Sequence, residues 1–341
     1  MEQPVGGPQG RHRVRSLVVT IIAVALLWAA FVVPIPIFFE YLPGPVRDVE
    51  SLVHVTGAPT YGSQGHLYLT TVYVDINVTL AQVIGSLFRS DASIVLRQAV
   101  TGGASISKLL QDNRQMMSSS KMQAEALVLS QLGLGQPTGD GAEIQATTAG
   151  GPANNLLKQG DVVVAVDGHR VGTTCAAGKL LERHAVGDTV ALTIRRSGGT
   201  KTVRLKTGDN PQDPGVPYLG VLWSNLHYRF QPKVHVAFKT GRIAGPSAGL
   251  MFALALYDKL TPNDLTGGRK IAGTGAIACD GAVGPIGGIQ EKVAAAEKQG
   301  AQIFLAPRSE APDAAQVASG MKIVPVMTFD GALRYLKGLS R

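Results

Sequence analysis

The longest apolar stretch of the chain lies near its N-terminus, at residues 17–39, and its first part is interrupted only by Thr20. A run of about 23 residues is long enough to cross a bilayer as one helix. The residues that precede it are basic, at Arg11, His12, Arg13 and Arg15. Because basic flanks stay on the cytoplasmic side, the pattern predicts a cytoplasmic segment over residues 1–16, one membrane-spanning helix, and an extracytoplasmic remainder.

The alternative interpretation of this run is a cleaved secretory signal. Such a signal ends in small residues at alternate positions before the cleavage point. The chain continues instead with Phe38, Phe39, Glu40 and Tyr41. The sequence therefore favours an uncleaved, single-pass anchor in the cell membrane.

A second apolar run, at residues 250–257, predicts a helix that is buried on most sides. A tight turn precedes it, because Gly245 permits unusual backbone angles and Pro246 suits a first helical position. Elsewhere, β-branched and alternating patterns predict strands, at residues 51–55, 65–78, 234–238, 302–307 and 322–326. A helix is predicted over residues 111–132. This mixture of elements predicts an α+β fold.

Residues 132–207 form a distinct unit of short strands and tight turns. The strand at residues 162–166 lies between two turn signals, Gly160 with Asp161 and Asp167 with Gly168. A helix is predicted from Thr174 to Arg183, followed by two paired strands. A proline-rich linker over residues 208–217 separates this unit from the C-terminal part of the chain.

Composition changes this picture little. Hydrophobic residues make up 45% of the chain and charged residues 16%, which describes a globular chain with an apolar addition. The net charge of +8 does not predict nucleic-acid binding, because no basic patch is interleaved with aromatic residues. The two cysteines, Cys175 and Cys279, lie in different predicted units and lack a metal-ligand spacing. They are expected to be structural or idle thiols, and no metal or cofactor is predicted.

Ser247 occupies a position with catalytic potential. It falls in the first turn of the predicted core helix, where free N–H groups and the positive end of the helix dipole favour an alkoxide. The loop residues around it are Gly245, Pro246 and Ala248, and N–H groups there could serve as an oxyanion hole. The alternative is that Ser247 only caps the helix.

Lys292 is the candidate base. It lies near the start of a predicted helix that ends at Gly300, and its neighbours Ile289 and Val293 are apolar. Apolar surroundings disfavour the charged ammonium and lower the pKa of a lysine. A neutral lysine could take the proton of a serine hydroxyl. The alternative is a solvated helix residue like Lys298.

Together these motifs carry a resemblance. Gly245-Pro246-Ser247-Ala248-Gly249, Gly273-Thr274-Gly275 and Pro285-Ile286-Gly287-Gly288 leading to Glu291-Lys292 resemble the proteolytic domain of Lon proteases. The resemblance implies that Ser247 is the nucleophile, Lys292 the general base, and Thr274 a residue that orients the lysine. The chain departs from the family at Ala244, where many Lon sequences carry Asp. We therefore expect a loop of different shape.

The middle unit resembles a PDZ domain of the bacterial protease-associated type, in Gly151-Pro152-Ala153, Leu157 to Asp161 and Val166-Asp167-Gly168. Such domains bind an extended peptide as an added strand. The segment predicted to bind it is Leu132-Gly133-Leu134-Gly135. Lon proteolytic domains begin with strands far before their serine, so the PDZ unit is expected to interrupt that domain. The predicted ranges are 48–131 and 218–341 for the two parts of the proteolytic domain, with 132–207 between them.

The resemblance also implies partners. No Gly-x-x-x-x-Gly-Lys-Ser/Thr motif for ATP occurs in the sequence, as in the smaller membrane-anchored Lon-like proteases. We therefore expect an ATP-independent serine endopeptidase that acts on flexible or unfolded polypeptides, in a homo-oligomeric ring such as a hexamer. The alternative is a membrane-tethered, chaperone-like scaffold that binds peptides through a catalytically idle fold.

Overall fold

The computed structural model describes residues 9–211, 213–241 and 243–339. The first half of the predicted basic segment at residues 1–16 lies outside the described residues. The last two residues of the predicted range 218–341 lie outside them as well.

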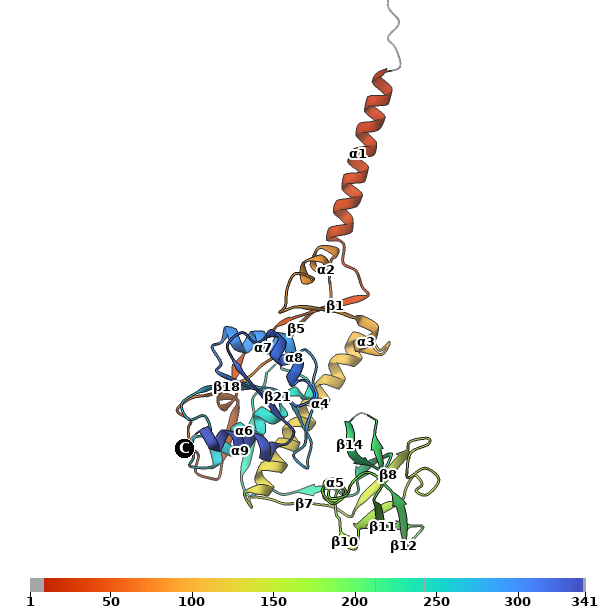
Figure 1. The fold of residues 1–341 in the computed structure, drawn as a ribbon, viewed down its shortest axis with the longest axis vertical. Helices are drawn as coiled ribbons and strands as arrows, with labels where there is room; N and C mark the ends of the chain where they lie inside the picture. Colours follow the sequence, from red (N-terminus) through yellow and green to blue (C-terminus); the bar gives the residue numbers. More distant parts are fainter. Residues whose placement is uncertain (1–8, 212, 242, 340–341) are drawn as a thin grey trace, which may run out of the picture.

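The chain begins with a helix, α1 (Gln9–Val32), that stands away from the rest of the molecule (Figure 1). Its described side chains from Leu17 onwards are mostly apolar and exposed. Of the residues that the structure describes, none form a helix with both the length and the apolar character that crossing a membrane requires. The transmembrane helix over residues 17–39 stays a prediction, and the strand β1 (Phe38–Pro43) begins inside that range.

A small antiparallel sheet lies at the base of α1, in the order β5-β1-β6. Its other strands are β5 (Val72–Asp75) and β6 (Ser93–Leu96). Two short helices of the same segment are α2 (Leu80–Ser86) and α3 (Arg97–Thr101). Thr79 starts α2 with a capping box, in which its hydroxyl accepts from Gln82 N and its own N–H donates to the Gln82 side chain. A bridge between Pro34 and Thr79 holds α2 beside the end of α1.

The main sheet belongs to an α/β domain and has five strands in the order β2-β4-β18-β21-β22. Its strands are β2 (Arg47–Asp48), β4 (His66–Leu69), β18 (Lys270–Gly273), β21 (Ile303–Pro307) and β22 (Lys322–Val326). The last four run parallel, and β2 pairs with β4 antiparallel. Mixed α and β content is thus confirmed.

Helices cover both faces of this sheet, α6 and α9 below and α7 and α8 above in Figure 1. They are α6 (Gly249–Leu260), α7 (Ile289–Lys298), α8 (Ala311–Val317) and α9 (Phe329–Leu339). Because side chains alternate along a strand, Leu67 and Leu69 of β4 pack with α6 and α9, while Tyr68 packs with α7. Residues 249–258 of α6 are all buried, as its apolar sequence predicts. Burying each large side chain there contributes about 1.5–3 kcal/mol.

The predicted strand at residues 65–78 is two strands in different sheets. β4 pairs with β18 in the main sheet, and β5 pairs with β1 at the base of α1. The chain changes sheet at Thr70 and Thr71, where the Thr71 carbonyl accepts from Gly44 N at 3.0 Å. The uninterrupted β-branched sequence carries no signal of this change.

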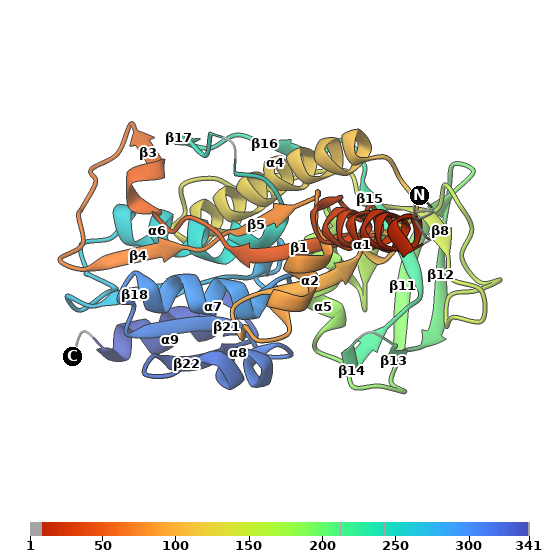
Figure 2. The same ribbon diagram turned by 90° about the horizontal axis from the view of Figure 1, so that it is seen from above.

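A long helix, α4 (Ile106–Gln131), runs beside α6 and leads to the middle domain (Figure 2). Ser105 caps its start by accepting from Lys108 N. Because β4 precedes the middle domain and β18 follows it, that domain interrupts the α/β domain. A further antiparallel pair, β3 (Val53–Thr56) with β17 (His235–Phe238), also joins segments from either side of it.

The middle domain has a sheet with the order β12-β11-β9-β8-β15, and β10 pairs with β9. Its elements are β8 (Ala142–Thr147), β9 (Val162–Val166), β10 (His169–Arg170), α5 (Thr174–Leu181), β11 (Thr189–Arg196), β12 (Gly199–Lys206) and β15 (Val221–Asn225). A hairpin of β13 (Gly208–Asn210) and β14 (Asp213–Tyr218) precedes β15. The short ribbon of β7 (Pro137–Thr138) and β16 (Arg229–Phe230) is where the chain enters and leaves this domain.

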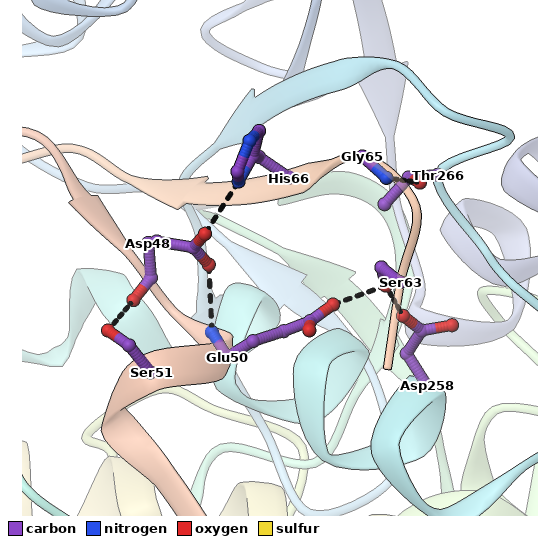
Figure 3. Close-up of polar contacts among 8 residues, drawn as sticks. All are labelled: Asp48, Glu50, Ser51, Ser63, Gly65, His66, Asp258 and Thr266. Carbon is purple, nitrogen blue, oxygen red and sulfur yellow. Dashed lines mark hydrogen bonds and ion pairs between the residues drawn. The ribbon is translucent and has the colours of Figure 1, made fainter. Parts of the chain in front are cut away.

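A pair of carboxyl groups, the buried Asp258 and the half-buried Glu50, fixes the C-terminal end of α6 (Figure 3). Ser63 Oγ hydrogen-bonds with the carboxylates of Glu50 and Asp258, and Leu265 N donates to Asp258 Oδ1 at 2.8 Å. Burial raises the pKa of Asp258 from 3.8 to about 6, and the charge of Glu50 acts in the same direction. The pair ties the loop before β4 to the C-terminal end of α6, whose N-terminal end follows the turn that carries Ser247.

The expectation of idle thiols is wrong, because Cys175 and Cys279 form a disulfide. Cys175 lies in α5 of the middle domain. Cys279 lies in the turn between β19 (Ala276–Ile277) and β20 (Val283–Gly284), which belongs to the α/β domain. Their Cα atoms are 5.6 Å apart although 104 residues separate them in sequence. That separation is why the sequence alone gave no sign of the pairing.

Candidate functional site

The turn before α6 has the geometry that its sequence predicts. Gly245 has a φ of +93°, which favours glycine, and Pro246 opens a short 3-10 turn, η2 (Pro246–Ala248). Ser247 lies in the middle of that turn and is half-buried. Gly275 N donates to the Ser247 carbonyl at 2.9 Å. The candidate nucleophile therefore sits on backbone held from a second segment.

Helix α4 holds the same turn from its other side. Gly245 N donates to the Asn113 carbonyl at 2.9 Å, and Ser120 Oγ donates to the Pro246 carbonyl at 3.1 Å. The sequence analysis missed these two contacts, because no local motif marks them in a long helix. The oxyanion role of Gly245, Pro246 and Ala248 stays a prediction.

Lys292 reaches the turn through Thr274. Its side chain is on α7 and is buried, at 3% exposed. Lys292 Nζ donates to Thr274 Oγ1 at 3.4 Å, and that hydroxyl donates to the Ser247 carbonyl at 3.0 Å. Within the described residues, Lys292 Nζ and Ser247 Oγ share no direct hydrogen bond. The structure thus brings the three predicted residues together, with Thr274 between the other two.

The environment of Lys292 shifts the lysine toward its neutral form. Burial lowers the pKa of the Lys292 ammonium from 10.5 to about 8, and the carboxylates of Glu310 and Glu291 act in the opposite direction. Glu291 is itself buried and accepts from Ser93 Oγ of β6. Glu310 accepts from Ile286 N at 2.9 Å. A lysine with such a pKa loses its proton far more readily than an exposed one.

Neither carboxylate was singled out from the sequence. Glu291 adjoins Lys292 and was visible as part of a motif. Glu310 follows a separate strand, and only the fold brings it near the lysine.

A pocket of about 400 Å³ adjoins the Ser247 turn. Its lining comes from three elements, with Asp112, Met116 and Gln123 among the α4 residues, Pro246 from the turn, and Ile277 from β19. The pocket therefore has both apolar and polar walls and lies next to the turn that carries Ser247.

The predicted peptide-binding segment, Leu132 to Gly135, does not lie at an edge of the middle domain's sheet. It follows α4 as a helix cap in which Leu134 N donates to the Leu129 carbonyl at 2.7 Å. Leu132 and Leu134 pack against the core of the α/β domain. In the sheet of the middle domain the edge strands are β12 and β15.

A search of the described residues finds no group of His, Cys, Asp or Glu side chains arranged to hold a metal ion.

Two family models match the chain. Residues 224–336 match the Lon protease (S16) C-terminal proteolytic domain, and residues 115–207 match the PDZ domain. The chain therefore contains a Lon-type proteolytic domain and a PDZ domain, and the middle domain holds most of the latter. Ser247, Thr274 and Lys292 all lie within the proteolytic match.

Curated relatives are similar over part of the chain. A Lon protease from Roseiflexus castenholzii is 42% identical over 82 residues, which cover 24% of this chain and 10% of that protein. A Lon protease from Campylobacter concisus is 37% identical over 116 residues, which cover 33% of this chain and 14% of that protein. The chain spans less than a fifth of the length of these relatives.

Among solved structures, the PDZ domain of an SdrC-like protein from Listeria monocytogenes is 22% identical. The match covers 25% of this chain and 90% of that one, with a TM-score of 0.24.

Proposed function

We propose that this chain is an ATP-independent serine endopeptidase of the Lon-like type that cleaves flexible or unfolded polypeptides. The observation that carries the proposal is the buried Lys292, with a pKa of about 8, linked through Thr274 to the backbone of Ser247. A base with that pKa is partly neutral near physiological pH, where it can accept a proton.

In the proposed reaction, neutral Lys292 takes the proton of Ser247 Oγ as that oxygen attacks the scissile carbonyl carbon. The protonated lysine then donates to the departing amine, and an acyl-enzyme remains on Ser247. Water, deprotonated by the same lysine, hydrolyses the ester. Because Lys292 Nζ bonds to Thr274 in this structure, the lysine must move toward Ser247 Oγ before the first step. Catalytic hydrogen bonds are often long or absent before substrate binds.

The absence of a direct bond between the two side chains is also the observation that favours the second candidate, a peptide-binding scaffold with an idle site. In that case the middle domain would bind peptides and Lys292 would only fill the core.

We propose that the middle domain recruits peptide along β15 rather than at residues 132–135. β15 ends the sheet, so one side of its backbone can pair with an added strand. α5 lies beside it, because Thr174 N donates to Asn225 Oδ1 at 2.7 Å. Leu222 on β15 is apolar and 65% exposed, which suits contact with an apolar peptide.

Leu222→Asp is expected to weaken binding of an apolar decapeptide with a free C-terminal carboxylate by about tenfold, since a charge replaces apolar contact. Fluorescence polarisation on the full chain measures this. Val186→Asp is the matched control, because Val186 is exposed in a loop of the same domain. This variant is expected to bind the peptide as tightly as the unchanged chain. Equal binding by both variants would place the peptide elsewhere.

We propose as well that α1 anchors the chain in the cell membrane, with the catalytic domain outside the cytoplasm. Exposed apolar side chains along α1 support this, as do Leu87 and Phe88, which are 77% and 85% exposed in the segment after α2, near the base of α1. Apolar surface of this kind on a monomer marks a lipid or protein contact.

Deleting residues 1–33 tests the anchor and the activity together. The full chain is expected in the membrane fraction, and the shortened chain in the soluble fraction, because its apolar helix is gone. Both are expected to degrade an unfolded polypeptide without ATP. A shortened chain that stays with membranes contradicts the anchor, and a need for ATP, or no degradation at all, contradicts the proposed activity.

A further inference from the structure

The disulfide joins two domains whose apolar cores are separate. Among the described residues, the hydrophobic cluster of the middle domain shares no member with either cluster of the α/β domain. The chain itself connects the domains through the narrow ribbon of β7 and β16. A two-stranded ribbon alone is a flexible connection. Cys175–Cys279 is therefore a second, covalent point of attachment.

On the middle domain, the disulfide begins in the helix beside the proposed peptide edge. Cys175 is the second residue of α5, and Figure 1 shows α5 on the side of the domain that faces the α/β domain. Its neighbour Thr174 donates through both N and Oγ1 to Asn225 Oδ1 of β15, at 2.7 and 3.1 Å. A movement of β15 would thus be passed to Cys175.

On the α/β domain, the disulfide ends next to the wall of the pocket that adjoins the Ser247 turn. Cys279 lies two residues after Ile277, which lines that pocket together with Pro246. Ile277 also packs against the start of α6 so closely that a Cβ on Gly249 would lie 2.6 Å from its Cγ2. The segment that carries Cys279 is therefore in contact with the turn that carries Ser247.

A pair of carboxyl groups lies beside the disulfide, one from each domain. Asp280, which follows Cys279, lies against α5 and contacts the carboxyl of Glu182 at the end of that helix. Partial burial raises the pKa of Glu182 from 4.5 to about 7, the charge of Asp280 and a hydrogen bond with its carboxylate add to this, and Lys179 acts against it. When both carboxyls are ionised they repel each other. Above about pH 7 the disulfide therefore holds together two carboxylates that repel each other, whereas below it the protonated Glu182 can donate a hydrogen bond to Asp280.

We propose that the Cys175–Cys279 disulfide is a redox site that fixes the peptide-recruiting domain against the wall of the pocket beside the Ser247 turn, and that a dithiol reductant releases it. One thiolate of the reductant attacks one cysteine sulfur and the S–S bond breaks; the second thiolate then closes a disulfide on the reductant. Two electrons and two protons pass to the chain, leaving two cysteine thiols. Both cysteines are half-buried, so a reductant can reach them.

This inference rests on the proposed peptidase function for its consequence. In the oxidised form, a polypeptide held along β15 is presented to the pocket in a fixed direction. In the reduced form, only the ribbon sets that direction. Coupling between sites of this kind is typically worth about 5- to 150-fold.

The structural part of the proposal is tested by measurements that do not depend on peptidase activity. These are hydrogen exchange and maleimide labelling of the full chain before and after treatment with dithiothreitol. Reduction is expected to expose two reactive thiols and to speed exchange in α5 and in residues 278–282. The Cys175→Ser, Cys279→Ser double variant is expected to show the faster exchange without reductant. Unchanged exchange in both cases would overturn the release.

The functional part compares an unfolded polypeptide with a short peptide that is too small to reach both sites. Reduction and the double variant are each expected to lower kcat/KM for the polypeptide about tenfold and to change it less than about twofold for the peptide. At a pH above the Glu182 pKa of about 7, Asp280→Asn removes the repulsion and is expected to lessen the effect of reduction. Loss of both activities to the same degree would mean that the disulfide only stabilises the fold. If hydrogen exchange changes on reduction as expected but the chain hydrolyses neither substrate, the proposed peptidase activity is contradicted instead.

Discussion

Replacing Lys292 by arginine is expected to reduce peptide hydrolysis by a factor of roughly 10³ or more, although the charge and length of the side chain change little. The reason is that a guanidinium does not lose its proton at any working pH, so it cannot take the proton of Ser247. Ser247→Ala is expected to be equally inactive. The double variant Ser247→Ala, Lys292→Ala should be no worse than either single change, because two residues that act as one unit are not additive.

The matched control is Lys298→Arg. Lys298 lies on the same helix, is 65% exposed and pairs with Asp91 at 2.8 Å, so its replacement should leave the rate unchanged. Thr274→Ala should retain a reduced rate, because Thr274 contacts Lys292 and the Ser247 carbonyl without entering the reaction. Thermal melts of each variant separate loss of folding from loss of chemistry. A folded Lys292→Arg chain that hydrolyses peptide at the wild-type rate would rule out the dyad.

The rate of hydrolysis should also rise with pH. Lys292 acts only when neutral and burial sets its pKa at about 8, so kcat/KM should fall about tenfold for each pH unit below that value and level off above it. A profile measured with a short peptide reports the free enzyme and avoids the middle domain. A rate that stays constant from about pH 6 to 9 would contradict a lysine base.

The pH–rate profile has an inflection at the pKa of Lys292. The pH of this inflection can be tested separately from the rise in rate. The Glu310 carboxylate raises the pKa of Lys292, so Glu310→Gln should move the inflection to lower pH. Glu297→Gln is the control. Glu297 lies on α7, as Lys292 does, but its carboxylate accepts hydrogen bonds from the backbone of residues 319–321. A shift of equal size in both variants would mean that general surface charge, and not the nearby charge of Glu310, sets the pKa of Lys292.

The sequence predicted the parts of the site that local chemistry encodes. Gly245 and Pro246 define the turn before α6, and the apolar run behind them defines a buried helix, so the position of Ser247 followed from short-range rules. Lys292 was identified through the motif from Pro285 to Lys292 that resembles Lon proteolytic domains, because its apolar neighbours alone do not separate a base from a solvated helix residue. The family model of the Lon proteolytic domain matches the same region.

Other features depend on contacts that are distant in sequence. The hydrogen bond from Ser120 to Pro246 joins two helices that no motif relates. The pairing of Cys175 with Cys279 depends on how two domains meet, which their separate patterns do not encode. The division of residues 65–78 between two sheets occurs where the β-propensity of the sequence is uniform. In each case tertiary contact, rather than local preference, decides the outcome.

The interruption of the α/β domain also bears on how the chain folds during synthesis. β4 leaves the ribosome long before β18, because the whole middle domain is made between them, and β4 has no parallel neighbour until β18 arrives. Pairing of such distant segments is slow, since loop closure must precede any gain from contact. The middle domain, whose strands are close in sequence, can fold first. During this interval the edge of β4 is exposed to pairing with other chains, which would make the nascent protein dependent on chaperones.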